Sequence, residues 1–385
     1  MGNTINVIVL GGGLVGAPMA YDLAADRTFR VTVADRDQAV LDHICSRGLG
    51  IKVVQQDLSN PESVRALVSA FDMVINSVPG FMGFETAKAI IQAKKHCACI
   101  AFYDEDPFEL DHQAKENDVS MIIDCGIYPG MGSVLIMDAV QKLDHVESVL
   151  SYVGGLPVIR EWPCQYKAVF SPIDVIEEYL RPARYVENGF DVVRPALSDP
   201  EYIYFPEIGT LEAFNTDGLR TLAKTIDAPN LKEKTLRYPG HIEQMAMLRE
   251  LGFFSKRKSL DANGVKISPL EMTSKVLFPN WKLKQGEADI TIFKSLVKGK
   301  KDGVELVTTI DLYDRYCPDT DVISMARTTG YTATAALRMM AQGIYTTKGI
   351  SPPEFMGRCP ECVDFMQSEL KNRGVNWRVT VSEAA

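Results

Sequence analysis

Residues 5–16 read INVIVLGGGLVG, an apolar run that leads directly into closely spaced glycines. Ile5–Leu10 predicts a β-strand and the residues after Gly16 predict a helix, so the glycines form the turn between them. Gly11, Gly13 and Gly16 have the spacing G-x-G-x-x-G. Between a strand and a helix, this spacing permits a tight turn, close approach of the backbone to a pyrophosphate, and close helix packing. The stretch therefore predicts a dinucleotide-binding turn, with the diphosphate at the helix N-terminus.

The second apolar run indicates which dinucleotide is bound. Arg30–Ala34 predicts a strand that ends at Asp35, 19 residues after Gly16. A carboxylate at this place bonds to the ribose hydroxyls and repels a 2′-phosphate, which favours NAD. Arg36 follows directly and is able to hold a phosphate, so NADP remains the alternative.

Short apolar runs continue to alternate with helical stretches over the first third of the chain. This pattern predicts an α/β fold with a doubly wound parallel sheet of the Rossmann type, in which ligands bind beyond the carboxyl ends of the strands. The predicted strands are Ile5–Leu10, Arg30–Ala34, Ile51–Gln55, Asp72–Asn76, Cys97–Phe102 and Val119–Asp124. The residues that we expect to contact the cofactor follow these strands: Gly11, Gly13, Leu14, Val15, Gly16, Asp35, Arg36, Asp57, Leu58, Ser77, Val78 and Pro79.

The second half has a different pattern. Two pairs of alternating strands flank short turns, at Asn188-Gly189 and at 298–303, and predict β-hairpins. Further strands are expected at 146–155 and 166–170, and helices at 217–225, 241–251, 269–277, 325–341 and 360–371. We therefore expect a second α+β domain with a mixed or antiparallel sheet. The predicted domains are 1–130 for the dinucleotide and 131–342 for substrate binding and dimerisation, with 343–385 as a segment that can pack back onto the first.

Composition limits the classes of partner. The chain has 385 residues, 46% hydrophobic and 24% charged, with a net charge of −9. This charge disfavours nucleic acid and anionic membranes as partners, and no apolar run is long enough to span a bilayer. Because the first residues lead straight into a strand, we expect no signal peptide and a cytoplasmic protein. We also expect a homodimer, the commonest oligomer, acting on a small molecule.

The eight cysteines are mostly scattered through apolar segments, as buried free thiols are. Cys359 and Cys362 form a C-x-x-C pair. A structural zinc site usually needs two more ligands, and the sequence contains no second such pair and no paired histidines. No metal site is predicted.

Polar residues in loops provide the candidate acid–base and substrate-binding groups. Arg237 is suited to binding a carboxylate with two hydrogen bonds, or to a surface salt bridge. His241, at a predicted helix start, is a candidate proton acceptor, or packs or caps there. Thr216 and Asp217 either contact substrate or cap a helix. The remaining candidates are Tyr103 as an alternative acid–base group, and Glu212, Tyr238 and Asp124 as substrate contacts.

Several segments in order resemble the saccharopine dehydrogenase family in its reductase-like branch. They are VLGGGLVG, DMVINSVPG, DCGIYPGMGSVL, SYVGGLP, YKAVFSP, GTLEAFNTDGLRTL, KTLRYPGH and KGISPPE, from Val9 to Glu354. The segment 126–131 is most similar to that of the lysine 6-dehydrogenase subgroup, and Asp35 fits that subgroup's NAD preference. The resemblance implies oxidative deamination at the ε-carbon of lysine, which gives 2-aminoadipate 6-semialdehyde and ammonia.

This chemistry implies roles for the candidate residues. Arg237 would bind the α-carboxylate, Asp217 or Glu212 the α-ammonium, and His241 or a carboxylate would accept the amine proton. Cys125, Tyr128 and the Cys359/Cys362 pair depart from the family pattern. Two alternatives stay open: an NADPH-dependent reductase of the saccharopine or carboxynorspermidine type, and a non-catalytic NAD-binding regulator.

Overall fold

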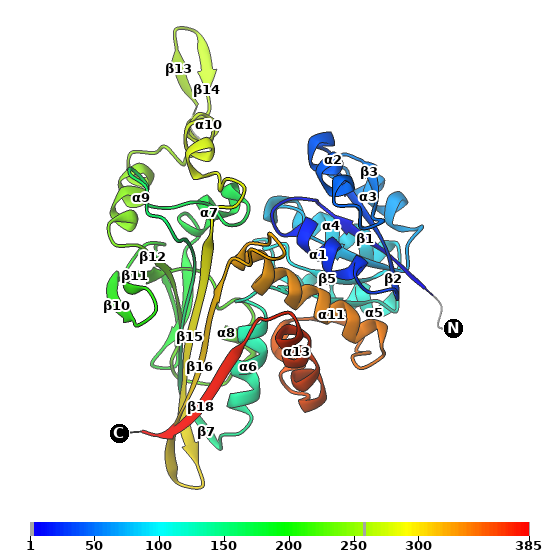
Figure 1. Ribbon diagram of the computed structural model, residues 1–385. Helices are drawn as coiled ribbons and strands as arrows, with labels where there is room; N and C mark the ends of the chain where they lie inside the picture. The colour runs from blue at the N-terminus through cyan, green and yellow to red at the C-terminus, as the bar shows by residue number, and fades with distance from the viewer. Residues whose placement is uncertain (1–3, 257–258, 385) are drawn as a thin grey trace. The chain divides into compact units, whose positions relative to one another are not determined.

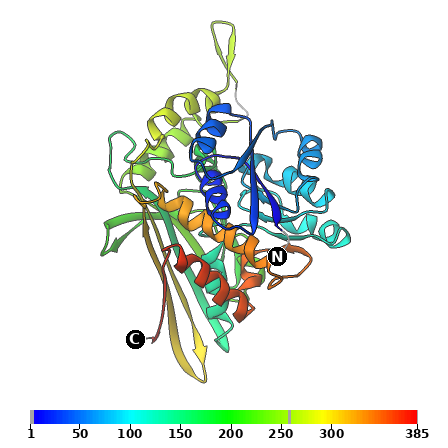
Figure 2. The ribbon, with the colours of Figure 1, turned by 45° about the vertical axis from the view of Figure 1, so that its right-hand side comes forward.

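The structure is a computed structural model that describes residues 4–256 and 259–384, apart from the side chain of residue 262. Its contacts divide the chain into two compact units. Unit 1 takes its described residues from Met1–Gln141 and Met325–Trp377, and unit 2 from Lys142–Ser324 and Arg378–Ala385. Figures 1 and 2 show the course of the chain in both units.

Unit 1 begins with alternating strands and helices, as predicted. These elements are β1 (Ile5–Leu10), α1 (Gly16–Ala24), β2 (Phe29–Asp35), α2 (Gln38–Ser46), β3 (Lys52–Gln55), α3 (Pro61–Val68), β4 (Met73–Asn76), α4 (Gly80–Gln92), β5 (His96–Cys99), η1 (Pro107–Leu110), α5 (Asp111–Glu116) and β6 (Ser120–Ile122). The later elements of the unit are α6 (Met131–Val140), the π-helical turn η2 (Ala326–Gly330), α11 (Tyr331–Ala341), β17 (Gly349–Ser351), α12 (Pro353–Met356) and α13 (Pro360–Asn372).

The strands of unit 1 form one parallel sheet in the order β17-β6-β5-β4-β1-β2-β3. The order reverses on either side of β1, which gives the topological switch point of a doubly wound fold. Alternate residues of the strands, such as Ile8, Leu10 and Val74, belong to the apolar core that α3, α4 and α5 cover. The predicted parallel α/β fold is confirmed, and β17 adds an edge strand that the sequence pattern did not indicate.

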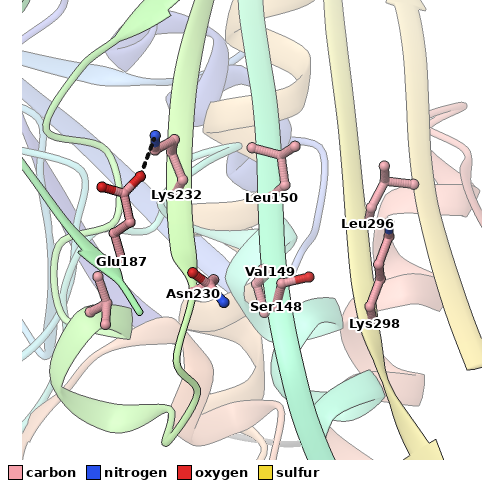
Figure 3. A pocket seen from close by; sticks show the side chains of 9 residues that line it. Ser148, Val149, Leu150, Glu187, Asn230, Lys232, Leu296 and Lys298 are labelled. Carbon is pink, nitrogen blue, oxygen red and sulfur yellow. Dashed lines mark ion pairs between the residues drawn. The ribbon is translucent and has the colours of Figure 1, made fainter. Parts of the chain in front are cut away.

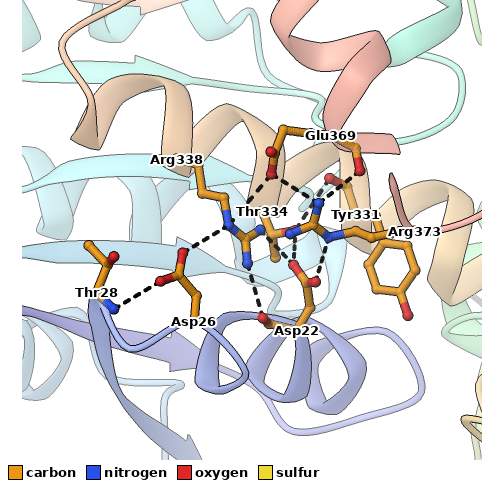
Figure 4. Close-up of polar contacts among 8 residues, drawn as sticks. All are labelled: Asp22, Asp26, Thr28, Tyr331, Thr334, Arg338, Glu369 and Arg373. Atoms are coloured by element: carbon orange, nitrogen blue, oxygen red, sulfur yellow. Dashed lines mark hydrogen bonds and ion pairs between the residues drawn. The ribbon is translucent and has the colours of Figure 1, made fainter. Parts of the chain in front are cut away.

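A buried ionic network ties the late helices of unit 1 to α1 (Figure 4). The Asp22 carboxylate accepts hydrogen bonds from Arg338 and Thr334 on α11, both at 2.6 Å, and from Arg373 at 2.5 Å. Arg373 also pairs with Glu369 on α13 at 2.9 Å. The side chains of Arg338 and Asp22 are only 4% and 10% exposed, so these buried ions depend on the network for their hydrogen bonds.

The late helices lie in a different unit from the one that the sequence indicated. The prediction assigned 131–342 to the second domain, but α6, η2 and α11 belong to unit 1. The reason is that α11 packs on α1, β4 and β5, while α6 packs on α12 and α13. Within 343–385, the chain up to Trp377 belongs to unit 1, and the residues from Arg378 on belong to unit 2.

Unit 2 is built on a mixed sheet. Its elements are β7 (His145–Pro157), α7 (Pro172–Glu178), β8 (Ala183–Glu187), β9 (Phe190–Arg194), β10 (Glu201–Phe205), β11 (Gly209–Asn215), α8 (Leu222–Thr225), β12 (Leu231–Arg237), α9 (His241–Glu250), β13 (Leu260–Ala262), β14 (Val265–Ile267), α10 (Pro269–Trp281), β15 (Asp289–Lys301), β16 (Val304–Arg315) and β18 (Trp377–Glu383), of which Trp377 belongs to unit 1. The sheet runs β10-β11-β12-β7-β15-β16-β18, with β8 and β9 attached beside β12.

The two predicted hairpins are confirmed as β8–β9 and β15–β16, and the mixed sheet is confirmed because β12 and β7 are parallel whereas β7 and β15 are antiparallel. Two predictions were wrong. Residues 166–170 are irregular apart from one bridge between Ala168 and Lys282. The helix predicted at 217–225 is reduced to α8 at its end, because Gly218 packs against a buried carboxylate and Arg220 adopts a left-handed φ of 51°.

A pocket of unit 2 lies over strands β7, β12 and β15 (Figure 3). Its lining includes Ser148, Asn230 and Leu296, and the ion pair between Lys232 and Glu187 at 3.6 Å. None of the predicted site residues lines it. The candidate chemistry lies elsewhere in the unit.

Candidate active site

The glycine turn of unit 1 has the geometry of a phosphate-binding loop. Gly11 has a φ of +98°, which favours glycine, and Gly16 begins α1. A Cβ at Gly16 would lie 2.0 Å from the Gly11 carbonyl oxygen, so no larger residue fits there. The Ser77 hydroxyl donates to the carbonyls of Leu10 and Gly11 at 2.8 and 3.0 Å, which fixes the turn against the end of β4.

Asp35 lies at the end of β2 and also holds the glycine turn. One carboxylate oxygen accepts the Gly12 N–H at 2.7 Å, and the other accepts the Asp37 N–H at 2.9 Å. Each carboxylate oxygen has further lone-pair capacity for hydroxyl donors. The side chain is half-buried beside an exposed Arg36. Its position is the one from which a carboxylate bonds to ribose hydroxyls in this fold.

The turn leaves room for a dinucleotide. A Cβ at Gly13 would meet no described atom within 4 Å, and Gly13 and Leu14 are exposed. Open space in front of a helix N-terminus is where a pyrophosphate binds. Behind the turn, Gly330 of η2 packs on α1 so closely that its Cβ would lie 2.9 Å from Met19. We conclude that these residues fit a dinucleotide, with α1 braced from its other side by Gly330.

The other predicted cofactor residues lie at strand ends with different exposure. Asp57 is exposed and accepts the Ser59 N–H at 2.9 Å, and this bond lowers the pKa of its carboxyl. Leu58 and Val78 are buried in the apolar core, whereas Ser77 and Pro79 are half-buried. Leu58 and Val78 therefore support the loops through packing.

Tyr103, predicted as an acid–base group, and Asp124, predicted as a substrate contact, are both buried in unit 1. Tyr103 is 1% exposed and packs edge-on against Phe84, with ring centroids 5.6 Å apart. Asp124 is buried after β6, with a left-handed φ of 50°. Burial in the core corrects the prediction for Tyr103, because a proton acceptor has to reach the substrate.

Arg237 of unit 2 lies at the centre of a chain of buried polar groups. Its guanidinium donates to Glu178 at 2.6 Å, to the Tyr179 hydroxyl at 3.2 Å and to the Leu236 carbonyl at 3.0 Å. It also stacks over the Tyr166 ring, 4.6 Å from the centroid. An aromatic ring against a guanidinium attracts its positive charge and also fixes the orientation of its plane.

His241 extends this chain. Its Nδ1 lies 2.9 Å from the Cys164 carbonyl, which only accepts, so Nδ1 carries the proton. Nε2, 2.9 Å from the Tyr179 hydroxyl, is then the acceptor of that hydroxyl. The order of donation is therefore Arg237 to Tyr179, Tyr179 to His241, and His241 to Cys164.

This arrangement corrects the role predicted for His241. The residue is 1% exposed and both ring nitrogens are occupied. Burial, aided by the charge of Arg237, lowers the pKa of His241 to about 3. A neutral, fully bonded imidazole does not act as the predicted proton acceptor, but it fixes the Tyr179 hydroxyl that Arg237 contacts.

A second cluster centres on Glu233, on the same strand as Arg237. Its carboxylate accepts from the Thr216 hydroxyl at 2.7 Å, the Gly218 N–H at 3.0 Å and the Thr235 hydroxyl at 3.3 Å. Burial nevertheless raises the pKa of Glu233 to about 7, against the lowering effect of these bonds. Thr216, a predicted substrate contact, is committed to this internal cluster.

Three further predicted contacts have other partners. Asp217 is held by Arg184 through two hydrogen bonds of 2.8 and 2.6 Å, and its side chain is only 8% exposed. Glu212 accepts the Gly240 N–H at 3.0 Å and thus supports the start of α9. The Tyr238 hydroxyl donates to the Pro157 carbonyl at 2.9 Å.

The sequence reasoning missed Glu178, Tyr179, Tyr166 and Glu233. Glu178 matters most, because its side chain is 30% exposed while the Arg237 side chain is 2% exposed. Burial raises the pKa of Glu178, and Arg237 opposes that rise. The motif YKAVFSP, which contains Tyr166, was the available signal for part of this group.

The described chain has neither a cluster of metal ligands nor a helix that could cross a membrane. Within residues 4–256 and 259–384, no three or more His, Cys, Asp and Glu side chains are grouped as metal ligands. Over the same ranges, no helix has the length and apolar character needed to cross a bilayer.

Comparison with known proteins identifies the family. Residues 7–122 match the saccharopine dehydrogenase NADP binding domain, and residues 126–375 match the saccharopine dehydrogenase C-terminal domain. An alpha-aminoadipic semialdehyde synthase of Arabidopsis thaliana is 28% identical over 70% of this chain, which spans only 29% of that relative. A saccharopine dehydrogenase [NADP(+), L-glutamate-forming] of Schizosaccharomyces pombe is 21% identical over 94% of this chain and 97% of its own length.

A solved structure supports the fold. Apo saccharopine dehydrogenase (L-Glu forming) from Saccharomyces cerevisiae superposes with a TM-score of 0.78 at 21% identity, over 99% of this chain and all of that one. The two family domains together account for nearly the whole sequence, in the order that the motifs predicted. The chain belongs to the saccharopine dehydrogenase family, a family of NAD(P)-dependent oxidoreductases.

Proposed function

We propose that this chain is an NAD-dependent L-lysine 6-dehydrogenase, which converts lysine to 2-aminoadipate 6-semialdehyde and ammonia. The observation that carries the choice of cofactor is Asp35, whose carboxylate lies at the end of β2 and is bonded to the Gly12 N–H. A fixed negative charge there repels a 2′-phosphate and accepts hydrogen bonds from ribose hydroxyls. The S. pombe relative carries NADP in its name, so this chain would differ from it in cofactor.

The Arg237–Glu178 pair supports an amino-acid substrate. A zwitterionic head carries a carboxylate and an ammonium group, and this pair offers the complementary charges 2.6 Å apart. Glu178 is the partly exposed member, so a substrate reaches the pair from its side. We propose that Arg237 binds the α-carboxylate and that Glu178 binds an ammonium group, in place of the roles predicted for Asp217 and Glu212.

The residues of the chain would position the substrate and the cofactor and pair with their charges, whereas the redox step belongs to the cofactor. A bound nicotinamide would supply the hydride acceptor for the carbon that bears the amine. Gly11, Gly13 and Asp35 would hold the pyrophosphate and ribose, and Arg237 with Glu178 would orient the amino acid. Tyr179 and His241 keep the guanidinium fixed, because Tyr179 accepts from Arg237 and donates to His241, and His241 donates to the Cys164 carbonyl.

The test is NADH formation at alkaline pH with lysine, ornithine, saccharopine and polyamines, each with NAD and with NADP. We expect turnover with lysine and NAD. Glu178→Gln should raise KM for lysine about tenfold or more, since a hydrogen bond to a charged group contributes about 1.5–3 kcal/mol. Asp144→Asn is the matched control, because it removes a carboxylate that pairs with Lys301 in an exposed turn.

Other outcomes would decide between the alternatives. NADPH consumption only when an aldehyde and an amine are supplied together would identify a reductase of the saccharopine or carboxynorspermidine type. Tight NAD binding without turnover of any amine would identify a regulator. A normal KM for lysine in both Glu178→Gln and Arg237→Lys would remove this pair from the substrate site.

A further inference from the structure

The C-x-x-C pair lies at the start of a helix, where neither thiol is used by the site described above. Cys359 is the N-cap residue of α13, and Cys362 is in its first turn. Cys359 is half-exposed, and Cys362 is 1% exposed. The outer position therefore has access to solvent, and the inner position lies directly behind it.

The two thiols interact with each other. The Cys362 thiol makes a side-chain hydrogen bond with Cys359 that favours the protonated form of Cys362. Burial, followed by this bond, raises the pKa of Cys362 to about 12. The inner thiol therefore stays protonated as a donor to the outer sulfur until the outer sulfur has reacted.

The start of α13 presents backbone N–H groups beside the outer sulfur. Pro360 occupies the first helical position and has no N–H, so the N–H groups of Glu361 and Cys362 are the first that α13 presents. In the described chain, the Cys359 side chain accepts no capping hydrogen bond from them. Helix N-termini with a C-x-x-C pair are environments where thiolates form and exchange with disulfides.

The surroundings of the pair favour exchange with a disulfide over metal binding. Arg358 precedes Cys359 and is exposed, with its guanidinium over the Phe355 ring at 4.5 Å, and the exposed Glu361 brings a negative charge near Cys362. The described residues supply no third His, Cys, Asp or Glu ligand to the two sulfurs. Two thiolates alone provide half of the ligands that a structural zinc ion takes.

We propose that Cys359 and Cys362 form a reversible dithiol/disulfide site that exchanges with low-molecular-weight disulfides of the glutathione class. The Cys359 thiolate attacks one sulfur of the disulfide, whose S–S bond breaks and releases one thiolate. Cys362 then loses its proton and attacks the Cys359 sulfur, which releases the second thiolate. The net change oxidises two cysteines to one disulfide, reduces the external disulfide to two thiols, and transfers both protons to them.

The tryptic cleavage sites of the chain allow this pair to be measured apart from the other cysteines. Trypsin cuts after Arg358 and after Lys371, so one peptide, 359–371, contains both cysteines and no others. Peptide 37–47 contains only Cys45, an exposed cysteine that serves as the control. The full chain is incubated with mixtures of reduced and oxidised glutathione, blocked with N-ethylmaleimide and digested with trypsin. The masses of the peptides are then measured by mass spectrometry.

We expect peptide 359–371 to lose both alkylation sites together and to be about 2 Da lighter than the reduced form, and to recover both with excess reduced glutathione. Peptide 37–47 should carry glutathione or the blocking group. Cys362→Ser should trap glutathione on Cys359, and Cys359→Ser should leave Cys362 unmodified. Cys362→Ala serves as the trap if the serine variant does not fold.

Three results would overturn the proposal. The first is full alkylation of both cysteines under conditions that modify Cys45. The second is a wild-type peptide that stops at glutathionylated Cys359. The third is a folded Cys362 variant without glutathione on Cys359. Each readout is a mass, so it is independent of whether lysine is the substrate.

Discussion

The neutral state assigned to His241 predicts how the free energy of unfolding changes with pH. Its pKa is lowered from 6.5 to about 3 in the folded chain, chiefly by burial. Between these values the unfolded chain binds a proton that the folded chain does not, so stability rises with pH across this window and is lost as pH falls. Evaluated at pH 4 against pH 8, the loss that His241 contributes is about 3 kcal/mol.

The perturbation is His241→Asn, which retains a donor for the Cys164 carbonyl and removes the titrating ring. At pH 8 the variant should be about 1–3 kcal/mol less stable, because the Tyr179 hydroxyl loses its acceptor. At pH 4 this difference should vanish or reverse. The free energy of unfolding is measured in urea through the fluorescence of Trp281, whose ring centroid lies 6.4 Å from that of His241, with the other two tryptophans replaced by phenylalanine.

Parallel profiles of the wild-type and variant chains from pH 8 to pH 4 would refute a neutral buried His241. Kinetics supply a second discrimination. A positioning residue changes KM for lysine more than kcat, whereas loss of a general base lowers kcat by about 10²–10⁴. A large loss of kcat with unchanged KM would return His241 to the role predicted from the sequence.

Three further predictions follow from the buried groups. Because the pKa of Glu233 is raised to about 7, the free energy of unfolding of the wild-type chain should fall by about 3 kcal/mol as pH rises from about 4.5 to 7. Glu233→Gln should therefore have a higher melting temperature than the wild-type chain above pH 7 and lose this advantage near pH 5, as measured by scanning fluorimetry. Arg338→Met should destabilise unit 1 by about 1.5–3 kcal/mol, since the buried Asp22 carboxylate loses one charged hydrogen bond and keeps Arg373, whereas Arg338→Lys should recover part of the loss in urea titrations. Asp35→Asn should lower kcat/KM with NAD about 10–100-fold and narrow the preference over NADP, measured from initial rates.

The nucleotide half of the site could be predicted because its signals are local. Gly11, Gly16 and Asp35 act within one strand–turn–helix–strand unit, so their spacing in the chain fixes their spacing in space. The register of β1 against β2 places Leu10 opposite Ala34, which brings the turn beside Asp35. Family-like motifs then carried the prediction to the rest of the chain.

The substrate half could not be predicted in the same way. Arg237 and Glu178 are 59 positions apart and meet where the last residue of α7 contacts the last residue of β12, which periodicity does not reveal. Asp217 and Glu212 looked available as isolated carboxylates, but Arg184 and the Gly240 N–H hold them. Burial of polar side chains was the missing information, because alternation does not indicate which polar residues a sheet encloses.

The late helices show the same limit. α11 was predicted as a helix, but its contacts with α1, which lies more than 300 positions earlier, could not be predicted. The Asp22–Arg338 contact is 316 positions long in sequence and follows from no local pattern. Helix existence depends on composition, whereas helix location depends on partners that only the folded chain reveals.

One measurement tests the central claim most directly. The chain is supplied with NAD and lysine deuterated at carbon 6, and the reduced nicotinamide is analysed by mass spectrometry. Oxidative deamination at carbon 6 predicts one deuterium in the reduced cofactor and 2-aminoadipate 6-semialdehyde as the product. Reduced cofactor that carries deuterium only when lysine is labelled at carbon 2, or no reduced cofactor at all, would contradict the account.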